Sequence, residues 1–112
     1  MTLDLDSFRT RLRAEARELT DAADRSAAEL APVQLDQQSV GRLSRMDALQ
    51  VQAMAKAEQE RRLARLRRVE TALARIDSGD FGYCVQCDED IEPKRLEADP
   101  TVPLCIKCAG AG

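Results

Sequence analysis

The sequence predicts a mainly α-helical protein, an antiparallel two-helix coiled-coil hairpin followed by a small module held by four cysteines. Two long segments repeat apolar residues at helical spacing, and a polar, proline-containing connection separates them. All four cysteines lie in the last third of the chain. We therefore expect the hairpin to cover residues 1–79 and the cysteine module to cover residues 80–112.

The first helix is expected from about residue 3 to residue 31. Large apolar residues recur in it at spacings of three, four and seven: Leu5, Phe8, Leu12 and Leu19. Asp4 and Asp6 fall in the first turn, where carboxylates interact favourably with the helix dipole. Pro32 disfavours helical backbone at the preceding residue, so it marks the expected end of the helix.

The second helix is expected from about residue 42 to residue 77, after a hairpin tip at residues 32–43. Apolar residues with heptad spacing run through its second half: Leu66, Val69, Leu73 and Ile76. Ser44 followed by Asp47 resembles a capping box, which leaves open a later start of the regular helix. Gly79 is placed to end the helix as a left-handed cap.

Alanines are concentrated toward the connection on both arms of the hairpin. Two explanations stay open: alanine favours helix wherever it stands, or small side chains let the two helix axes approach closely. The large apolar residues lie at the opposite end of the hairpin, next to the cysteine module. We therefore expect the distal part of the hairpin to be slimmer and less stable than its base.

The cysteines form two C-x-x-C pairs, Cys84 with Cys87 and Cys105 with Cys108, separated by seventeen residues. This spacing is typical of a C4 zinc site, because each pair presents two sulfur atoms along one edge of a tetrahedron. The chain contains no histidine, and four thiolate ligands leave no open position for catalysis. We therefore expect one structural Zn²⁺, which organises a module too small to fold on its few apolar residues.

Three other uses of the cysteines remain open: two disulfides, a redox C-x-x-C pair, and a rubredoxin-like iron site. The N-terminal residues contain no apolar run typical of a signal peptide, and no segment is long enough to span a membrane. We therefore expect a cytoplasmic protein, in which disulfides are rare. The redox motif normally accompanies a βαβ pattern that is missing here, and cysteine geometry does not separate iron from zinc.

Residues 76–108, IDSGDFGYCVQCDEDIEPKRLEADPTVPLCIKC, resemble the zinc finger of the DksA/TraR family. The most specific matches are the GDFGYC run at 79–84, Ile91, Arg95-Leu96, Pro100 and the second cysteine pair. Together with the hairpin before it, the resemblance covers nearly the whole chain. The chain resembles a short form, without the extra N-terminal segment and the C-terminal helix of long members, and its final Ala-Gly-Ala-Gly is expected to be frayed.

The resemblance implies a zinc-binding regulator of transcription whose partner is bacterial RNA polymerase rather than promoter DNA. In this family the hairpin enters the secondary channel of the polymerase, and its tip approaches the catalytic centre, often together with ppGpp. Well-characterised members carry an acidic D-x-x-D-x-A motif at the tip, where this chain has Gln38, Gly41 and Leu43. The candidate tip contacts are Asp36, Arg42, Arg45 and Asp47, each of which also has a plain structural explanation as a loop, first-turn or solvated side chain.

The charge balance argues against binding to nucleic acid. The chain has 17 basic and 20 acidic residues and a formal net charge of −3, and the arginine-rich run 61–68 contains no aromatic residue for base stacking. That run is either a solvated helix face paired with nearby glutamates or a contact for an acidic partner. The sequence offers no nucleophile–base pair, so we do not expect an enzyme. We also expect a monomer. The alternatives are a zinc-stabilised module for another protein partner and a thiol redox sensor that uses the same cysteines.

Overall fold

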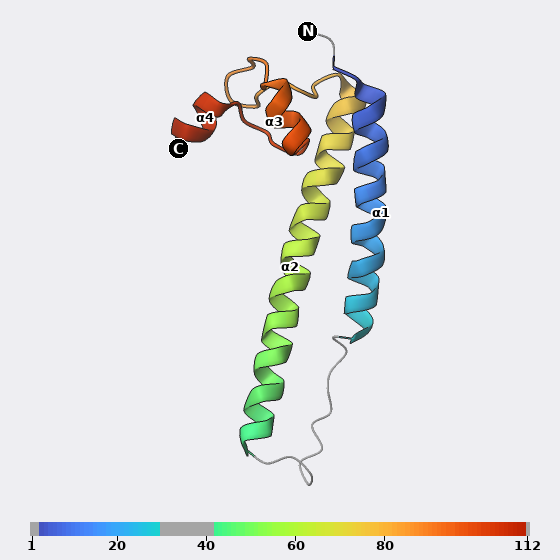
Figure 1. Cartoon of the computed structure of the whole chain (residues 1–112), viewed down its shortest axis with the longest axis vertical. Coiled ribbons are helices and arrows are strands. Elements are labelled where there is room, and N and C mark those ends of the chain that lie inside the picture. The colour runs from blue at the N-terminus through green and yellow to red at the C-terminus, as the bar shows by residue number, and fades with distance from the viewer. Residues whose placement is uncertain (1–2, 30–41, 112) are drawn as a thin grey trace. The chain divides into compact units, whose positions relative to one another are not determined.

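Four helices make up nearly all the regular structure. The computed structural model describes residues 3–29 and 42–111, without the side chains of residues 42–44 and 111. The helices are α1 (Leu5–Glu29), α2 (Arg42–Ser78), α3 (Pro93–Ala98) and α4 (Ile106–Ala111), as labelled in Figure 1. The described residues contain no β-strand, and their one β feature is an isolated antiparallel bridge in the segment between α2 and α3. The mainly helical class predicted from the sequence is confirmed.

Helix α1 begins two residues later than expected because Asp4 acts as its cap. The Asp4 side chain accepts a hydrogen bond from the backbone N–H of Ser7 at 3.1 Å, which satisfies one of the free donors of the first turn. Leu3 therefore precedes the helix. The described part of α1 ends at Glu29, and the expected end at residue 31 lies outside the described residues.

Helix α2 ends as the sequence predicts, at a glycine in the left-handed conformation. Gly79 has φ of 83°, and the carbonyl of Arg75 accepts hydrogen bonds from the N–H groups of Asp80 at 2.9 Å and Phe81 at 3.1 Å. The Arg75 side chain also donates to the carbonyls of Asp80 at 2.8 Å and Tyr83 at 2.9 Å. One arginine thus fixes the chain as it leaves the helix. The regular helix starts at Arg42 rather than at the alternative start near Ser44.

Helix α4 corrects the expectation of a frayed C-terminal tail. It starts at Ile106, inside the second cysteine pair, and runs to Ala111. The N–H of Ala109 donates to the carbonyl of Cys105 at 2.9 Å, so the first turn is closed at a cysteine. The alanines favour helix, and a turn already fixed at its start removes much of the cost of nucleating such a short helix.

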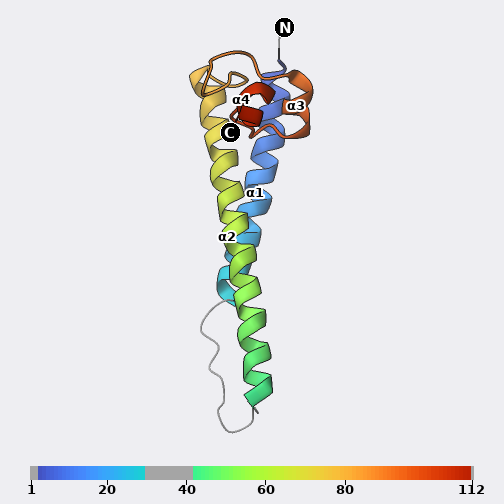
Figure 2. The same cartoon turned by 90° about the vertical axis from the view of Figure 1, so that its left-hand side faces the viewer.

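The chain divides into two compact units that both contain part of α1 and part of α2. The first unit comprises Met1–Arg17 with Arg67–Gly112, and the second comprises Glu18–Leu66. Within each unit, the two long helices lie side by side and antiparallel (Figures 1 and 2). This division differs from the one drawn from the sequence at residues 79 and 80. The cysteine module contributes too few apolar residues for a core of its own and shares one with the helix ends.

The shared core of the first unit joins residues from all its segments. Phe8 of α1 packs against Phe81 of the module, with ring centroids 5.2 Å apart and planes inclined at 50°. Leu12 and Val69 have no exposed surface, whereas Leu5, expected in the core, is 38% exposed at its edge. The other buried apolar side chains of this unit include Ala72, Ile76, Ile91, Leu96 and Pro100.

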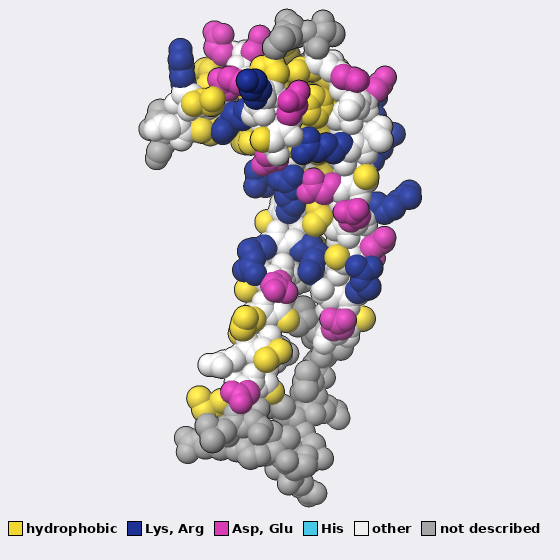
Figure 3. All heavy atoms as spheres, in the orientation of Figure 1, with side chains coloured by type: hydrophobic (Ala, Val, Ile, Leu, Met, Phe, Trp, Pro, Cys, Tyr) yellow, Lys and Arg dark blue, Asp and Glu magenta, His cyan; other side chains and the backbone are white. Residues whose placement is uncertain are grey.

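Polar contacts join the helices of the second unit. The side-chain amide of Gln59 donates to the carbonyl of Ala23 at 2.8 Å, and Arg62 donates to the hydroxyl of Ser26 at 2.8 Å. Ala23 is buried, but Ala27, Ala28 and Ala53 are exposed. The close approach of the two helices therefore explains why alanine occurs at position 23. Helix propensity explains the alanines at the exposed positions. Figure 3 shows basic and acidic side chains interspersed over α1 and α2.

Replacing Leu12 by alanine should destabilise the protein strongly. The side chain is fully buried, so the change leaves a cavity, and we expect a loss of about 2–5 kcal/mol in the free energy of unfolding. Leu63→Ala is the control, because Leu63 is 36% exposed and its loss should cost well under half as much. Urea unfolding followed by circular dichroism measures both, and equal effects would contradict a core centred on Leu12.

Candidate metal centre

The first cysteine pair is held by a short antiparallel turn. Tyr83 and Asp90 form the β-bridge, and the N–H of Cys84 donates to the carbonyl of Glu89 at 2.8 Å. The N–H of Asp88 returns to the carbonyl of Cys84 at 2.9 Å, and Asp88 itself has φ of 62°. Aspartate tolerates this left-handed conformation better than most residues do. The turn therefore places the Sγ atoms of Cys84 and Cys87 within 4.8 Å of each other.

The second cysteine pair is positioned by α3 and the segment after it. Pro93 occupies the start of α3, and Leu96 on the helix is 1% exposed. Arg95 donates from Nε to the carbonyl of Leu104 at 3.0 Å, directly before the pair. The carboxylate of Asp99 accepts hydrogen bonds from the N–H of Thr101 at 3.0 Å and from its hydroxyl at 2.7 Å. These positioning roles were not predicted from the sequence, although Asp-Pro-Thr is a recognisable turn signal.

A main-chain hydrogen bond joins the first pair to the segment just before the second. The N–H of Val85, inside the first pair, donates to the carbonyl of Pro103 at 2.9 Å. Cys84 and Cys105 are buried, Cys108 is partly buried, and Cys87 is exposed. The cluster therefore lies at the edge of the shared core, with one thiol open to water.

The four thiols have the geometry of a tetrahedral metal site. All four Sγ atoms lie within 4.8 Å of one another, and the Sγ atoms of Cys87 and Cys105 are 3.7 Å apart. A tetrahedron with Zn–S bonds of about 2.3 Å has edges of about 3.8 Å, so this pair already has the required separation. A disulfide requires about 2.05 Å between sulfurs, and all four cysteines are free.

The electrostatics of the cluster also suit a divalent cation. Burial raises the pKa of Cys84, but backbone N–H groups of Cys105, Cys87 and Gln86 outweigh it and lower this pKa to about 6. Contacts with the thiols of Cys105 and Cys87 raise the pKa of Cys108 to about 12. One thiol is thus readily ionised while its neighbour resists a further negative charge. A bound cation removes this conflict, because it compensates the thiolates together.

The tip candidates are only partly described by the structure. Arg45 and Asp47 lie on α2 with exposed side chains. Asp36 lies outside the described residues, and of Arg42 only the backbone is described, as the first residue of α2. The metal centre and these residues belong to different compact units.

The arginine-rich run at 61–68 makes specific contacts. Arg62 donates to Gln59 at 2.7 Å as well as to Ser26, and Arg68 forms an ion pair with Asp99 at 3.3 Å. Arg62 and Arg68 therefore have structural partners, which differ from the glutamates expected from helical spacing.

Comparison with known proteins supports the same kind of site. Residues 79–111 match the family model for the prokaryotic dksA/traR C4-type zinc finger. The chain is 31% identical over 105 residues to the RNA polymerase-binding transcription factor DksA of Escherichia coli K12, a match that covers 93% of this chain and 68% of that protein. It is 47% identical over 51 residues to the protein of the same name in Haemophilus influenzae, covering 46% of this chain and only 34% of the relative.

A solved structure extends the similarity to the three-dimensional fold. The structure of transcription factor DksA2 from Pseudomonas aeruginosa superimposes with a TM-score of 0.74 at 29% sequence identity. The match covers 96% of this chain and 81% of that one. The C4-type match and the four clustered thiols together support one structural zinc ion in the module.

Replacing Cys105 by serine should release the metal. We expect bound zinc to fall from about one ion per chain to well below half, because structural zinc needs its full set of four ligands. Val85→Ala is the matched control, since Val85 lies in the other cysteine pair but is 52% exposed and offers no ligand atom. Elemental analysis of the purified proteins measures the stoichiometry. Full zinc retention in the serine variant would contradict the assignment.

Proposed function

Because the chain belongs to the DksA/TraR family of C4-type zinc-finger proteins, we propose that it binds bacterial RNA polymerase and regulates transcription through the secondary channel. The observation that carries this proposal is the combination of a C4 module with a long antiparallel helical hairpin, matched over 93% of the chain by a polymerase-binding factor. Helix α2 has 37 residues and is therefore about 55 Å long, a length suited to reaching deep into a channel.

The zinc ion has a structural role in this proposal. We assign Cys84, Cys87, Cys105 and Cys108 as its four ligands, on the separation of their Sγ atoms. Four thiolates fill the coordination shell, so the metal supplies folding energy and offers no site for substrate. The protein then acts by binding and not as an enzyme.

The N-terminal half of α2 offers an apolar surface for a protein partner. Met46, Leu49, Val51 and Met54 are 54–68% exposed, an unusual concentration of large apolar side chains on one helix. Methionine side chains adapt readily to irregular partner surfaces. Arg45 and Asp47 on the same part of α2 add charge, and we propose that this region contacts the polymerase.

None of the described helices is long and apolar enough to cross a membrane. We propose that the protein acts in the cytoplasm, where its partner works. We propose that it approaches polymerase as a monomer. Its net charge of −3 disfavours binding to the phosphate backbone of DNA, and we propose no sequence-specific contacts to DNA.

Purified RNA polymerase core should bind the zinc-loaded protein at micromolar concentration. The DksA protein of Escherichia coli should displace it, because both are proposed to occupy the same channel. Fluorescence anisotropy of a labelled chain measures both effects. Absence of binding at tens of micromolar would contradict the proposed function. Binding that the Escherichia coli protein does not displace would contradict the secondary channel as the binding site of this chain.

A photo-crosslinking residue at position 47 should react with polymerase segments that line the secondary channel. Position 47 is exposed on the part of α2 proposed to make contact, whereas Glu70 is exposed on the part that belongs to the other compact unit. A crosslinker at position 70 is therefore the control and should give a different set of products. Mass spectrometry identifies the products, and crosslinks from position 47 confined to the outer surface of the polymerase would refute insertion.

A further inference from the structure

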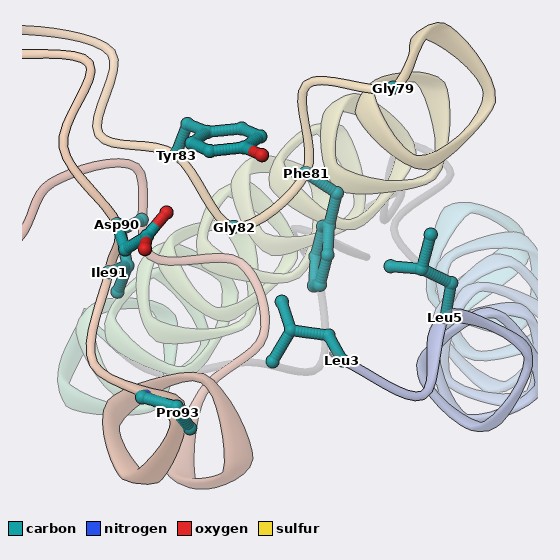
Figure 4. Close-up of a pocket in the computed structure, with 9 residues that line it drawn as sticks. All are labelled: Leu3, Leu5, Gly79, Phe81, Gly82, Tyr83, Asp90, Ile91 and Pro93. Carbon is teal, nitrogen blue, oxygen red and sulfur yellow. The ribbon is translucent and has the colours of Figure 1, made fainter. Parts of the chain in front are cut away.

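A pocket in the first unit is lined largely by residues of the metal module but by none of its cysteines. It has a volume of about 250 Å³. Its lining comes from Leu3, the start of α1, the segment between α2 and α3, and the first residue of α3 (Figure 4). Sites for drug-sized molecules usually have about 300–1,000 Å³, so this pocket suits a single side chain better than a whole small molecule. Its apolar lining includes Leu3, Phe81, Ile91 and Pro93.

One edge of the pocket pairs an aromatic ring with a carboxylate. Tyr83 and Asp90 are directly opposite each other in the antiparallel bridge, so their side chains emerge on the same face. Hydrogen bonds of 2.8 Å from Cys84 to Glu89 and from Ile91 to Gly82 flank the pair. This makes it the closer, non-hydrogen-bonded type of cross-strand pair. Figure 4 shows the Asp90 carboxylate directed toward the Tyr83 ring.

Both side chains are available to a partner. Tyr83 is 47% exposed, and Asp90 is exposed. Within the part of the chain that the structure describes, Asp90 forms no ion pair and the Tyr83 hydroxyl forms no hydrogen bond. Arg75 comes near, but its guanidinium donates to the main-chain carbonyls of Asp80 and Tyr83. Packing in the core therefore does not explain why an aromatic ring and a carboxylate are paired at this position.

The local charge selects a cation as the occupant. The segment 79–93 contains five acidic residues and no lysine or arginine. A planar guanidinium stacks on an aromatic ring and binds a carboxylate through two parallel N–H groups. A lysine ammonium can also lie over a ring, but it cannot make the planar, two-pronged contact with the carboxylate. The methylene stem of the same side chain can lie along the apolar wall formed by Leu3, Ile91 and Pro93.

We propose that the Tyr83–Asp90 pair and its pocket bind an arginine side chain presented by RNA polymerase. This inference rests on the proposed function and adds a second contact, which belongs to the compact unit of the zinc module and not to the distal hairpin. The guanidinium stacks on Tyr83 and pairs with Asp90, and its stem enters the pocket. Zinc binding holds the pair in place, because Cys84 directly follows Tyr83 in the bridge.

Binding of polymerase core by full-length, zinc-loaded variants tests the contact. Asp90→Asn and Tyr83→Leu should each raise the dissociation constant about five- to tenfold, as expected for an exposed cation–π and charge contact. Tyr83→Phe keeps the ring and should bind like the wild type. The matched control is Glu89→Gln, which makes the same charge change one residue away, on the opposite face of the bridge. The double variant Tyr83→Leu/Asp90→Asn should lose less than the product of the single effects, because both groups act on one guanidinium.

The outcomes separate this inference from the proposed function. If the wild type does not bind polymerase, the proposed function fails. If the wild type binds and Asp90→Asn binds equally well, or Glu89→Gln loses as much as Asp90→Asn, only the arginine site fails. Zinc analysis of each variant establishes that the module remains folded.

A peptide titration tests the pocket without polymerase. Tyr83 is the only tyrosine of the chain, so its ring signals in NMR spectra report on one place. The peptide acetyl-Gly-Arg-Gly-amide at millimolar concentration should shift these signals in the wild type and not in Asp90→Asn. The same peptide with citrulline, which has nearly the same shape but no charge, should have little effect. Equal shifts with both peptides, or none with either, would overturn the proposal.

Discussion

The first compact unit depends on the closure of its four clustered thiols around the zinc ion that we propose they bind. Four sulfur atoms within 4.8 Å of one another cannot all carry negative charge unless a metal compensates them, and the opposed pKa shifts of Cys84 and Cys108 express that conflict. With zinc in place, the turn after α2 and the start of α4 are fixed to each other. The segments between the cysteines then need little apolar surface of their own.

The metal alone does not explain the first unit, because the module also completes the core of the helix ends. Phe81 packs on Phe8, and Leu12 and Val69 are fully buried in the same core. The Arg75 side chain donates to main-chain carbonyls where the chain enters the module, and the Asp99 carboxylate accepts from the Thr101 N–H within it. Zinc binding and helix packing therefore stabilise the same unit.

The second unit has a different physical character. Polar contacts from Gln59 and Arg62 join its helices, and large apolar side chains on the N-terminal half of α2 remain exposed. Exposed Met and Leu side chains lower solubility unless a partner covers them. Proposed contacts with polymerase thus fall in both units: apolar and charged residues of the distal hairpin, and an aromatic–carboxylate pair beside the zinc module.

The sequence by itself determined the helical class, the C4 zinc motif and the glycine that ends α2, because apolar spacing, C-x-x-C pairs and a left-handed cap are local signals. Only the tertiary structure decided that the module shares its core with the helix ends, since Phe8 and Phe81 are far apart in the chain. It also showed α4 where a frayed tail was expected, because a turn closed at Cys105 starts the helix. The Tyr83–Asp90 pair became visible only through the bridge, which sets the two residues on one face.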